Sequence, residues 1–203
     1  SFANEPLQNE IAGGGITLLF EHKNFKATGQ LFTLNFYPGD DVKGQICDLQ
    51  KDHCNYYVEQ DGIDPESCMP LITFNNAKIK DGTAFTAGGK GYKFTLDLPL
   101  GDVAIPLVLE DAQVVADVVI KDGKVVSLIG VLGGAVAKQT FLDGVEAIPE
   151  KDAASLPLPK EGLKQLIDLL IQNDVDTTGD GNPNAASIGL AIKGISGSVI
   201  GIK

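Results

Sequence analysis

Hydrophobic and polar residues alternate along much of this chain, which is the pattern of β-strands with one buried face. The alternation is clearest over residues 30–37, where Leu34 and Phe36 alternate with Asn35 and Tyr37. Similar stretches recur at short intervals. The predicted strands are residues 16–20, 30–37, 55–59, 71–74, 77–79, 92–100, 103–109, 114–120, 125–132, 188–192 and 199–200.

Turn-forming residues separate several of these strands. Residues 38–41, Pro-Gly-Asp-Asp, predict a turn that ends the second strand. The Asp122-Gly123 pair predicts a tight hairpin between residues 114–120 and 125–132. These two late strands are apolar on both faces, so we expect the sheet they join to be covered on both sides.

The spacing of the hydrophobic residues becomes helical after residue 140. Residues 141–148 and 163–170 each carry an apolar face, Pro149 closes the first segment and Pro159 opens the second. The predicted fold is therefore mainly β, a β-sandwich or flattened barrel with two helices toward the C-terminus.

The chain carries no sign of an internal repeat or of a long linker. We expect a single β-rich domain over residues 1–203. Residues 1–15 are predicted to form a loose N-terminal arm, and residues 158–203 a closing segment of helix, polar loop and strands.

Composition narrows the classes of partner. The chain has 43% hydrophobic and 21% charged residues, which is ordinary for a folded domain. Its net charge is -11, and all 16 basic residues are Lys, so nucleic acid is a poor partner. No apolar run approaches the roughly 18 residues of a transmembrane helix. The first residue is Ser1 rather than Met, as expected after removal of an export signal or from a trimmed chain.

Three cysteines lie within one polar stretch, at Cys47, Cys54 and Cys68. Such loops carry disulfides in exported proteins, so we expect a Cys47–Cys54 or a Cys54–Cys68 bridge and one unpaired thiol. Together with His53 these residues also supply a zinc ligand set, but their spacing matches no zinc finger. The predicted location is the periplasm, the outer surface or the extracellular space.

Residues 173–187 carry the clearest candidate chemistry. Calcium takes six to eight oxygen ligands from alternating positions of a sharply turned loop with glycine at the sixth position. With Asp176 at the first position, Gly181 falls on the sixth. The predicted calcium ligands are Asp176, Thr178, Asp180, Asn182, Asn184 and Ser187, with Asp174 as an outer charge or a further ligand.

Two positions depart from the usual calcium loop. Thr178 stands where Asp or Asn is usual, and Ser187 stands where a bidentate Glu is usual. We therefore expect modest affinity, with Kd about 10⁻⁴ to 10⁻³ M. The alternative is a turn rich in Asp, Asn and Gly that needs no ion.

This loop resembles the thrombospondin type-3 and EF-hand-like calcium loops. With the preceding helix and the following glycine-rich strand, it also resembles the C-terminal end of uncharacterised exported proteins, many of them lipoproteins, of myxobacteria-like Gram-negative bacteria. The wider likeness covers about the last 45 residues. It implies an envelope or extracellular location and no particular activity.

The sequence gives little support to catalysis. The chain has only two histidines, His22 and His53, and His22 is predicted to be an exposed strand residue. The residues around Ser187 weakly resemble a nucleophile elbow, but no histidine follows Ser187 in the sequence. We expect a non-enzymatic, calcium-binding structural or interaction protein that pairs with a protein partner or with itself through strand edges or the N-terminal arm. The alternative is a carrier of a small apolar ligand or lipid in a β-barrel, and a secreted hydrolase is the least favoured reading.

Overall fold

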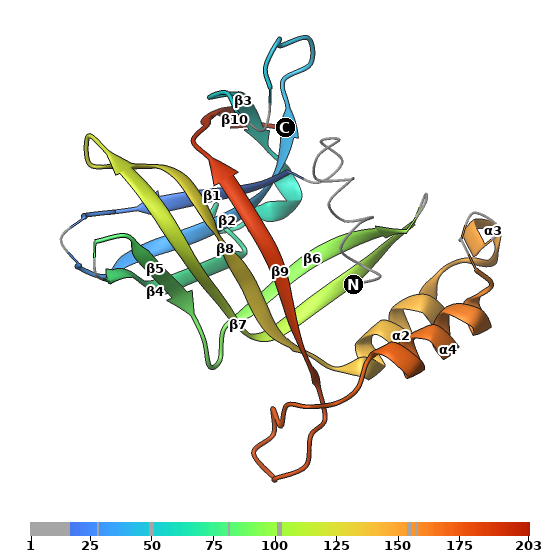
Figure 1. Cartoon of the computed structure of the whole chain (residues 1–203). Coiled ribbons are helices and arrows are strands. Elements are labelled where there is room, and N and C mark those ends of the chain that lie inside the picture. Colours follow the sequence, from blue (N-terminus) through green and yellow to red (C-terminus); the bar gives the residue numbers. More distant parts are fainter. Residues whose placement is uncertain are drawn as a thin grey trace. The chain divides into compact units, whose positions relative to one another are not determined.

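A computed structural model describes residues 17–27, 29–48, 51–80, 82–100, 103–153, 156 and 158–203, with only the backbone at 98–100, 103–105, 152 and 170. The predicted N-terminal arm lies outside these residues. The elements, in chain order, are β1 (Thr17–Lys23), β2 (Phe32–Asp41), β3 (Asn55–Val58), η1 (Gln60–Gly62), β4 (Ile72–Lys80), β5 (Ala84–Gly88), β6 (Lys93–Leu100), β7 (Val103–Lys121), β8 (Lys124–Val136), α2 (Lys138–Ala147), α3 (Glu150–Ala153), α4 (Lys160–Leu170), β9 (Ala186–Ile195) and β10 (Ser198–Ile202) (Figure 1).

The strands form one large mixed, mostly antiparallel sheet that is not closed. Its order is β10-β3-β2-β4-β5-β7-β8-β9, with β1 paired to β2 and β6 paired to β7. The β10–β3 pair is parallel, whereas β2 pairs antiparallel with β1, β3 and β4. The prediction of a mainly-β fold with two helices toward the C-terminus is confirmed.

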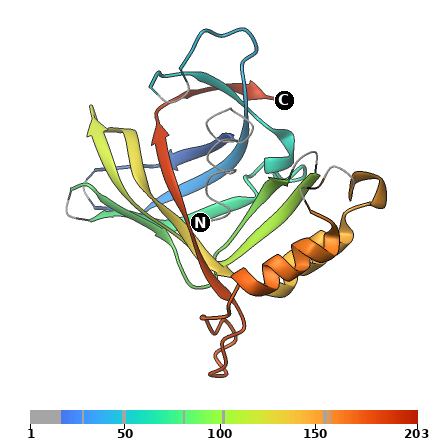
Figure 2. The ribbon, with the colours of Figure 1, turned by 45° about the vertical axis from the view of Figure 1, so that its right-hand side comes forward.

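The chain divides into two compact units. One comprises residues 1–88, 113–132 and 190–203, and the other comprises residues 89–112 and 133–189. The first unit therefore holds β1 to β5, η1 and β10, and the second holds β6, α2, α3 and α4. Strands β7, β8 and β9 contribute to both (Figures 1 and 2). The single domain inferred from the sequence stays a prediction.

The core of the first unit comes from alternating positions of its strands. Phe32, Leu34 and Phe36 of β2 are buried, and the Phe36 ring packs on Phe74 of β4 with centroids 4.8 Å apart. On the opposite face of β2, Asn35 is buried and donates a hydrogen bond to Glu21. The period-2 pattern of residues 30–37 is thus a strand with an apolar face and a hydrogen-bonded polar face.

The turn predicted at residues 38–41 is wrong, because β2 continues through Asp41. At this point β1 and β3 both pair with β2, with Gly39 opposite Thr17 and Val58. A Cβ atom at position 39 would lie 2.8 Å from Cγ of Leu19, so glycine permits a close strand approach here. Pairing on both sides overrides the local preference for a turn.

Strand β7 includes residues 110–113, a polar segment that lies between two strands predicted separately from the sequence. Residues 103–109 and 114–120 belong to one strand, which pairs with β6 up to Glu110 and with β5 from Gln113. Asp111 between them has a φ of 51°, and its carboxylate accepts a hydrogen bond from the Gly91 N–H. The break in polarity is therefore an irregularity within one strand rather than a loop. In the same way, residues 71–74 and 77–79 merge into β4.

The outer face of the late strands is exposed. Val115 and Val119 of β7 and Ile129 and Val131 of β8 are each about half exposed or more, while Val114, Val118 and Leu128 are buried. The expectation that both faces are covered is wrong for these described residues. The hairpin between the strands is confirmed, with positive φ at Asp122 and Gly123.

In the second unit, α2 and α4 pack through Val145, Ile148 and Leu163. Lys164 of α4 forms an ion pair with Glu146 of α2. The helical spacing of the apolar residues and the boundary roles of Pro149 and Pro159 are confirmed. Among the described residues, no helix combines the length and the apolarity needed to cross a membrane.

Candidate functional site

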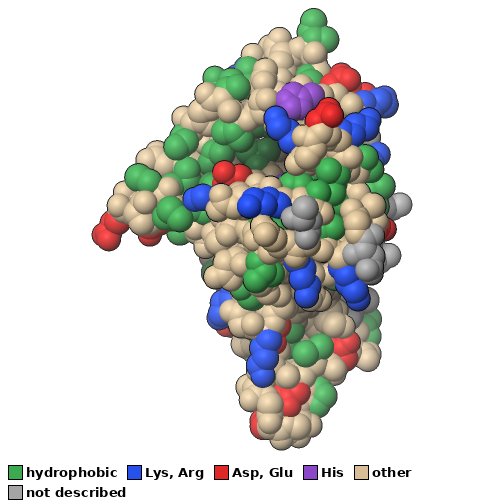
Figure 3. Space-filling model, turned by 90° about the vertical axis from the view of Figure 1, so that its left-hand side faces the viewer, with side chains coloured by type: hydrophobic (Ala, Val, Ile, Leu, Met, Phe, Trp, Pro, Cys, Tyr) green, Lys and Arg blue, Asp and Glu red, His purple; other side chains and the backbone are tan. Residues whose placement is uncertain are grey.

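A pocket of about 650 Å³ lies within the first compact unit. Its lining comes from β1 on one side, β8 and β9 on another, and β3 and β10 with the connection that precedes β10. On the molecular surface, hydrophobic side chains gather around a hollow (Figure 3).

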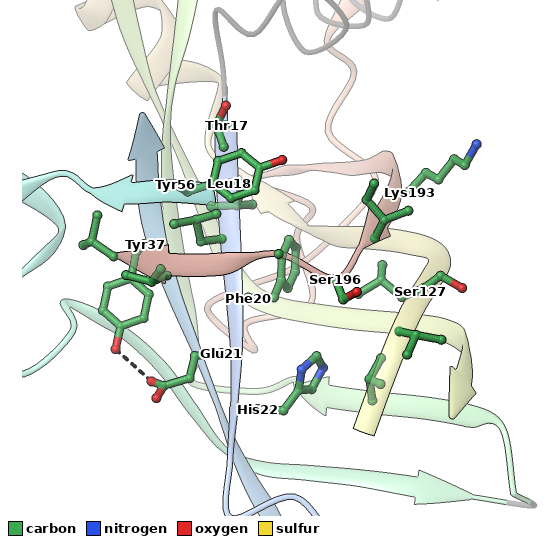
Figure 4. A pocket seen from close by; sticks show the side chains of 18 of the residues that line it. Thr17, Leu18, Phe20, Glu21, His22, Tyr37, Tyr56, Ser127, Lys193 and Ser196 are labelled. Atoms are coloured by element: carbon green, nitrogen blue, oxygen red, sulfur yellow. Dashed lines mark hydrogen bonds between the residues drawn. The ribbon is translucent and has the colours of Figure 1, made fainter. Parts of the chain in front are cut away.

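All six residues of β1 from Thr17 to His22 border the pocket. Phe20 and His22 lie on one side of the strand and face residues of β8 to β10, whereas Glu21 and Tyr37 lie on the other (Figure 4). The Phe20 ring contacts Phe36 of the core with centroids 5.0 Å apart. One face of β1 therefore joins the pocket directly to the aromatic core.

Strand β8 and the segment from β9 to β10 form the opposite wall of the pocket. Val126 and Leu128 of β8 line the pocket, and the Val126 carbonyl accepts a hydrogen bond of 2.9 Å from the Ser196 N–H. Residues 195–197, which connect β9 to β10, thus lie beside β8. Ile195 adds another apolar side chain to this wall.

Strand β10 reaches the pocket because it pairs in parallel with β3. Val199 lies opposite Tyr56, and the Ser198 N–H donates to the Cys54 carbonyl over 2.9 Å. A Cβ atom at Gly197 would lie 2.6 Å from Cε2 of Tyr56, so only glycine fits beside this ring without a shift. The sequence predicted strands at residues 55–59 and 199–200, but no sequence pattern indicated that they pair with each other.

A disulfide anchors the start of β3. Cys47 and Cys54 are bonded, with Cα atoms 5.9 Å apart, within the usual range for disulfides. This decides between the two predicted pairings, and Cys54 is bonded rather than available for zinc. Cys68 is the remaining free thiol, is exposed and lies at the lining of the pocket.

His22 is partly buried against an aromatic cluster, and the prediction of an exposed residue is wrong. Its ring lies within 5.8 to 6.0 Å of three phenylalanine rings, measured between centroids: Phe25, Phe32 and Phe85. Burial lowers the pKa of His22 from 6.5 to about 4, so the ring is neutral at pH 7. Its Nε2 is buried and has no hydrogen-bond partner in the described structure. One residue of the pocket lining is therefore a neutral imidazole whose unsatisfied ring nitrogen is closed off from solvent.

A polar network occupies the other face of β1. The Tyr37 hydroxyl donates to the Glu21 carboxylate over 2.9 Å (Figure 4). The Asn35 amide donates to the same oxygen over 2.7 Å. Burial, the hydrogen bond and the charge of Glu21 together raise the pKa of Tyr37 to about 12. Glu21 is therefore engaged on the face away from His22.

His53 lies between two serines that are distant in sequence. Its Nδ1 is 3.0 Å from Ser196 Oγ, and its Nε2 is 2.8 Å from Ser198 Oγ. A serine hydrolase needs a His–Ser contact, but it also uses a third group to orient the imidazole and stabilise its charged form. Here the second nitrogen meets another hydroxyl, so the arrangement orients the β9–β10 connection without completing a triad.

The loop predicted to bind calcium is tied together by its own hydrogen bonds. The Asp176 carboxylate accepts from the Thr178 N–H and hydroxyl at 3.0 Å, from the Gly179 N–H at 2.7 Å and from the Gly181 N–H at 2.6 Å. These bonds, led by the one from Gly181, lower the pKa of Asp176. Gly179 and Gly181 both have positive φ, which the turn requires.

The hydrogen bonds of the other predicted calcium ligands go to partners other than Asp176. Asp180 accepts from the Asn182 N–H, and Asn184 accepts from the N–H and hydroxyl of Thr177. The Asp174 carboxylate accepts from the Ser187 N–H and hydroxyl, both at 2.6 Å.

The fit to calcium depends on the lone pairs that the loop leaves open at Asp176. A carboxylate offers about four lone-pair sites, two on each oxygen. Oδ1 of Asp176 accepts three of the four hydrogen bonds and Oδ2 accepts one. A cation at Oδ1 would have to exchange with these donors, whereas Oδ2 keeps one site. Within the described ranges, no three His, Cys, Asp or Glu side chains group as a metal site. Calcium binding at residues 173–187 stays a prediction.

Comparison of the chain with protein-family models, with curated proteins and with solved structures finds no significant match.

Proposed function

We propose that this protein is a non-enzymatic carrier that binds a small, mainly apolar molecule in the pocket between β1, β8 and β10. The observation that carries the proposal is the pocket itself, about 650 Å³ with Leu18, Phe20, Val126 and Leu128 in its lining. Ligand sites commonly have volumes of about 300–1,000 Å³ and mostly apolar walls with a few polar groups. This pocket falls within that volume range, and its lining combines apolar side chains with polar and charged ones, among them Glu21 and Lys193.

Ordinary packing is the alternative explanation for these apolar side chains. Protein interiors are close-packed, and voids larger than a water molecule are few. Leu18 and Phe20 are only partly buried, although each belongs to the apolar face of β1. A bound apolar molecule would remove their remaining surface from water, which stabilises a complex by about 25 cal/mol per Å² of apolar area.

The open sheet supplies a route into the pocket. In the described sheet, β1 has a strand partner only in β2 and β9 only in β8. We infer that the ligand enters beside these edges.

The direct test is binding of N-phenyl-1-naphthylamine, a neutral probe whose fluorescence rises in apolar surroundings. We expect saturable binding to the intact chain and its loss in Val126→Trp, which fills the pocket. Ile129→Trp is the matched control, because it puts the same side chain on the exposed face of the same strand. Equal binding by all three proteins, or by none, would refute the proposal.

The free thiol gives a second readout. Cys68 is exposed at the pocket lining, and the other two cysteines are bonded to each other. A bound probe is expected to slow alkylation of Cys68 in the wild type and not in Val126→Trp. An unchanged rate at saturating probe would place the probe elsewhere.

A second candidate is a structural or interaction protein of the envelope or the extracellular space. The edges of β1 and β9 support it, because an edge strand can accept a strand from another chain. The Cys47–Cys54 disulfide supports an oxidising compartment. Self-association through these edges predicts a concentration-dependent mass in size-exclusion chromatography with light scattering, and a constant monomer mass would count against it.

A further inference from the structure

We propose that the pocket takes an amphiphile with an anionic headgroup, whose apolar tail lies in the pocket and whose head pairs with Lys193 at the edge. This inference rests on the proposed carrier function and adds the chemical class of the ligand. It starts from the charged side chains of the lining. Among the described residues that border the pocket, Lys193 of β9 is the one lysine and Glu21 of β1 is the one carboxylate.

These two charges lie on opposite sides of the pocket (Figure 4). The Glu21 carboxylate already accepts hydrogen bonds from the Tyr37 hydroxyl over 2.9 Å and from the Asn35 amide over 2.7 Å. Lys193, in contrast, forms no ion pair with any residue of the described ranges. The lining therefore holds an anion that protein donors satisfy and, across from it, a cation that is open to a ligand.

The tail of the ligand has an apolar surface to lie on. Leu18 and Phe20 of β1 and Val126 and Leu128 of β8 all line the pocket. A hydrocarbon tail in contact with these side chains is removed from water, which drives binding without any directional contact. The tail therefore supplies the affinity, and the head sets which amphiphiles bind best.

The position of Lys193 places the head at the edge of the pocket. Lys193 is exposed, and its side chain points away from Phe20 (Figure 4). A headgroup that pairs with it keeps its contact with water, so the ligand avoids the cost of burying an ion in an apolar site. Ser127 and Ser196 lie on the same side of the pocket as Lys193 and add hydroxyl groups that can donate to an anion (Figure 4).

The charge of Lys193 decides between kinds of head. An ammonium group has three donors and no acceptor, so it pairs with carboxylate or phosphate oxygens and repels a cation. The net charge of -11 disfavours an anion anywhere else on the chain. A local cation beside an apolar surface is therefore what lets this acidic protein hold an acidic amphiphile.

The test is displacement of N-phenyl-1-naphthylamine by decanoate and by 1-decanol at pH 7.5, in the wild type, Lys193→Met and the control Lys80→Met. Methionine keeps a long unbranched side chain and removes the charge. Lys80 is exposed at the end of β4 and outside the lining, so the control changes the net charge by the same amount. In Lys193→Met we expect the ratio of decanoate to decanol affinity to fall about two- to fivefold, the range for an exposed ion pair. In Lys80→Met the ratio should stay at its wild-type value.

Two further measurements separate a lost ion pair from a damaged fold. Lys193→Glu should lower the ratio further and should strengthen binding of decylammonium, whose head carries the opposite charge. In the wild type, a rise from about 20 to about 300 mM NaCl should weaken decanoate and leave decanol unchanged, because salt screens exposed charges. Since Lys193 is exposed, urea unfolding of its variants should match that of the wild type.

The outcomes distinguish the two proposals. If the naphthylamine and both decyl ligands fail to bind, the carrier function fails and the assignment of the headgroup fails with it. If the naphthylamine and decanol bind but decanoate does not, or if all three proteins give the same ratio, the pocket stands and the pairing with Lys193 is refuted. An equal fall in Lys80→Met would also refute it, since net charge rather than Lys193 would then decide the binding.

Discussion

The burial of His22 predicts a specific dependence of stability on pH. The pKa of the ring is about 4 in the folded protein and 6.5 for the ordinary side chain. Between these values the unfolded chain binds a proton at His22 and the folded protein does not. The free energy of unfolding therefore falls as the pH falls from 6.5 to 4, and the contribution is fully present above pH 6.5.

The size of the effect follows from the same shift. A lowering from 6.5 to about 4 corresponds to about 3 kcal/mol at pH 4, of which about 2 kcal/mol is lost by pH 5. Phenylalanine in place of His22 keeps a ring among the neighbouring aromatic side chains and removes the proton site. In His22→Phe this part of the pH dependence should be absent.

The assay is urea unfolding at pH 7.5, 6 and 5 for the wild type, His22→Phe and the control His53→Gln. Carboxylates contribute equally to all three, so the differences between variants isolate the histidine. We expect wild type and His53→Gln to lose about 2 kcal/mol more than His22→Phe between pH 7.5 and 5. Because the chain has two histidines, proton NMR of the variants also assigns both imidazole titrations. Parallel curves for all three proteins, with a His22 midpoint near 6.5, would refute the burial argument.

Three other predictions test the walls of the pocket and the polar loop. Replacing Cys47 and Cys54 by serine removes a short covalent loop and should lower the free energy of unfolding by about 2–3 kcal/mol, measured in urea against the wild type; no change would mean that the unfolded chain is not restrained by the bridge. Gly197→Ala places a Cβ 2.6 Å from the Tyr56 ring and should cost about 1–3 kcal/mol and weaken probe binding, and an unchanged melt would show that the ring moves freely. Calcium at about 10 mM, compared with excess chelator, should stabilise the wild type by about 1–3 kcal/mol in thermal unfolding, because this concentration is about ten- to a hundredfold above the expected Kd of about 10⁻⁴ to 10⁻³ M; the shift should be lost in Asp180→Ala, and identical melts would make the loop an ion-free turn.

The strands were predictable where one sequence pattern decided the structure. Residues 30–37 alternate in polarity, and the structure buries Leu34 and Phe36 on one face of β2. The hairpin at Asp122-Gly123 was equally clear, because its turn needs positive φ at both residues. The predictions failed where pairing with distant strands overrode the local signal, as at residues 38–41.

The pocket itself was out of reach of sequence patterns. Strand β5 was missed because Ala84–Gly88 is short and mostly small, and its pairing with β7 lies about 30 residues away in sequence. His22 has charged neighbours in sequence, Glu21 and Lys23, and it becomes partly buried because Phe32 and Phe85 pack against its ring. Of the predicted site residues, the cysteine pairing is now decided, whereas the calcium ligands stay predictions.

The parallel pairing of β10 with β3 has a consequence for how the protein is made. One wall of the pocket begins at Thr17 and another reaches Ile202, so the site combines residues that leave the ribosome at very different times. At 5–20 residues per second, roughly 10–40 s separate these segments during synthesis. Throughout that interval β10 is absent, so β3 lacks its parallel partner and Leu18 and Phe20 of β1 lack part of the surrounding pocket wall. If the pocket carries a ligand as proposed, a nascent chain that is held or bound by a chaperone before residues 198–202 emerge could not take that ligand up, and loading would follow completion of the fold.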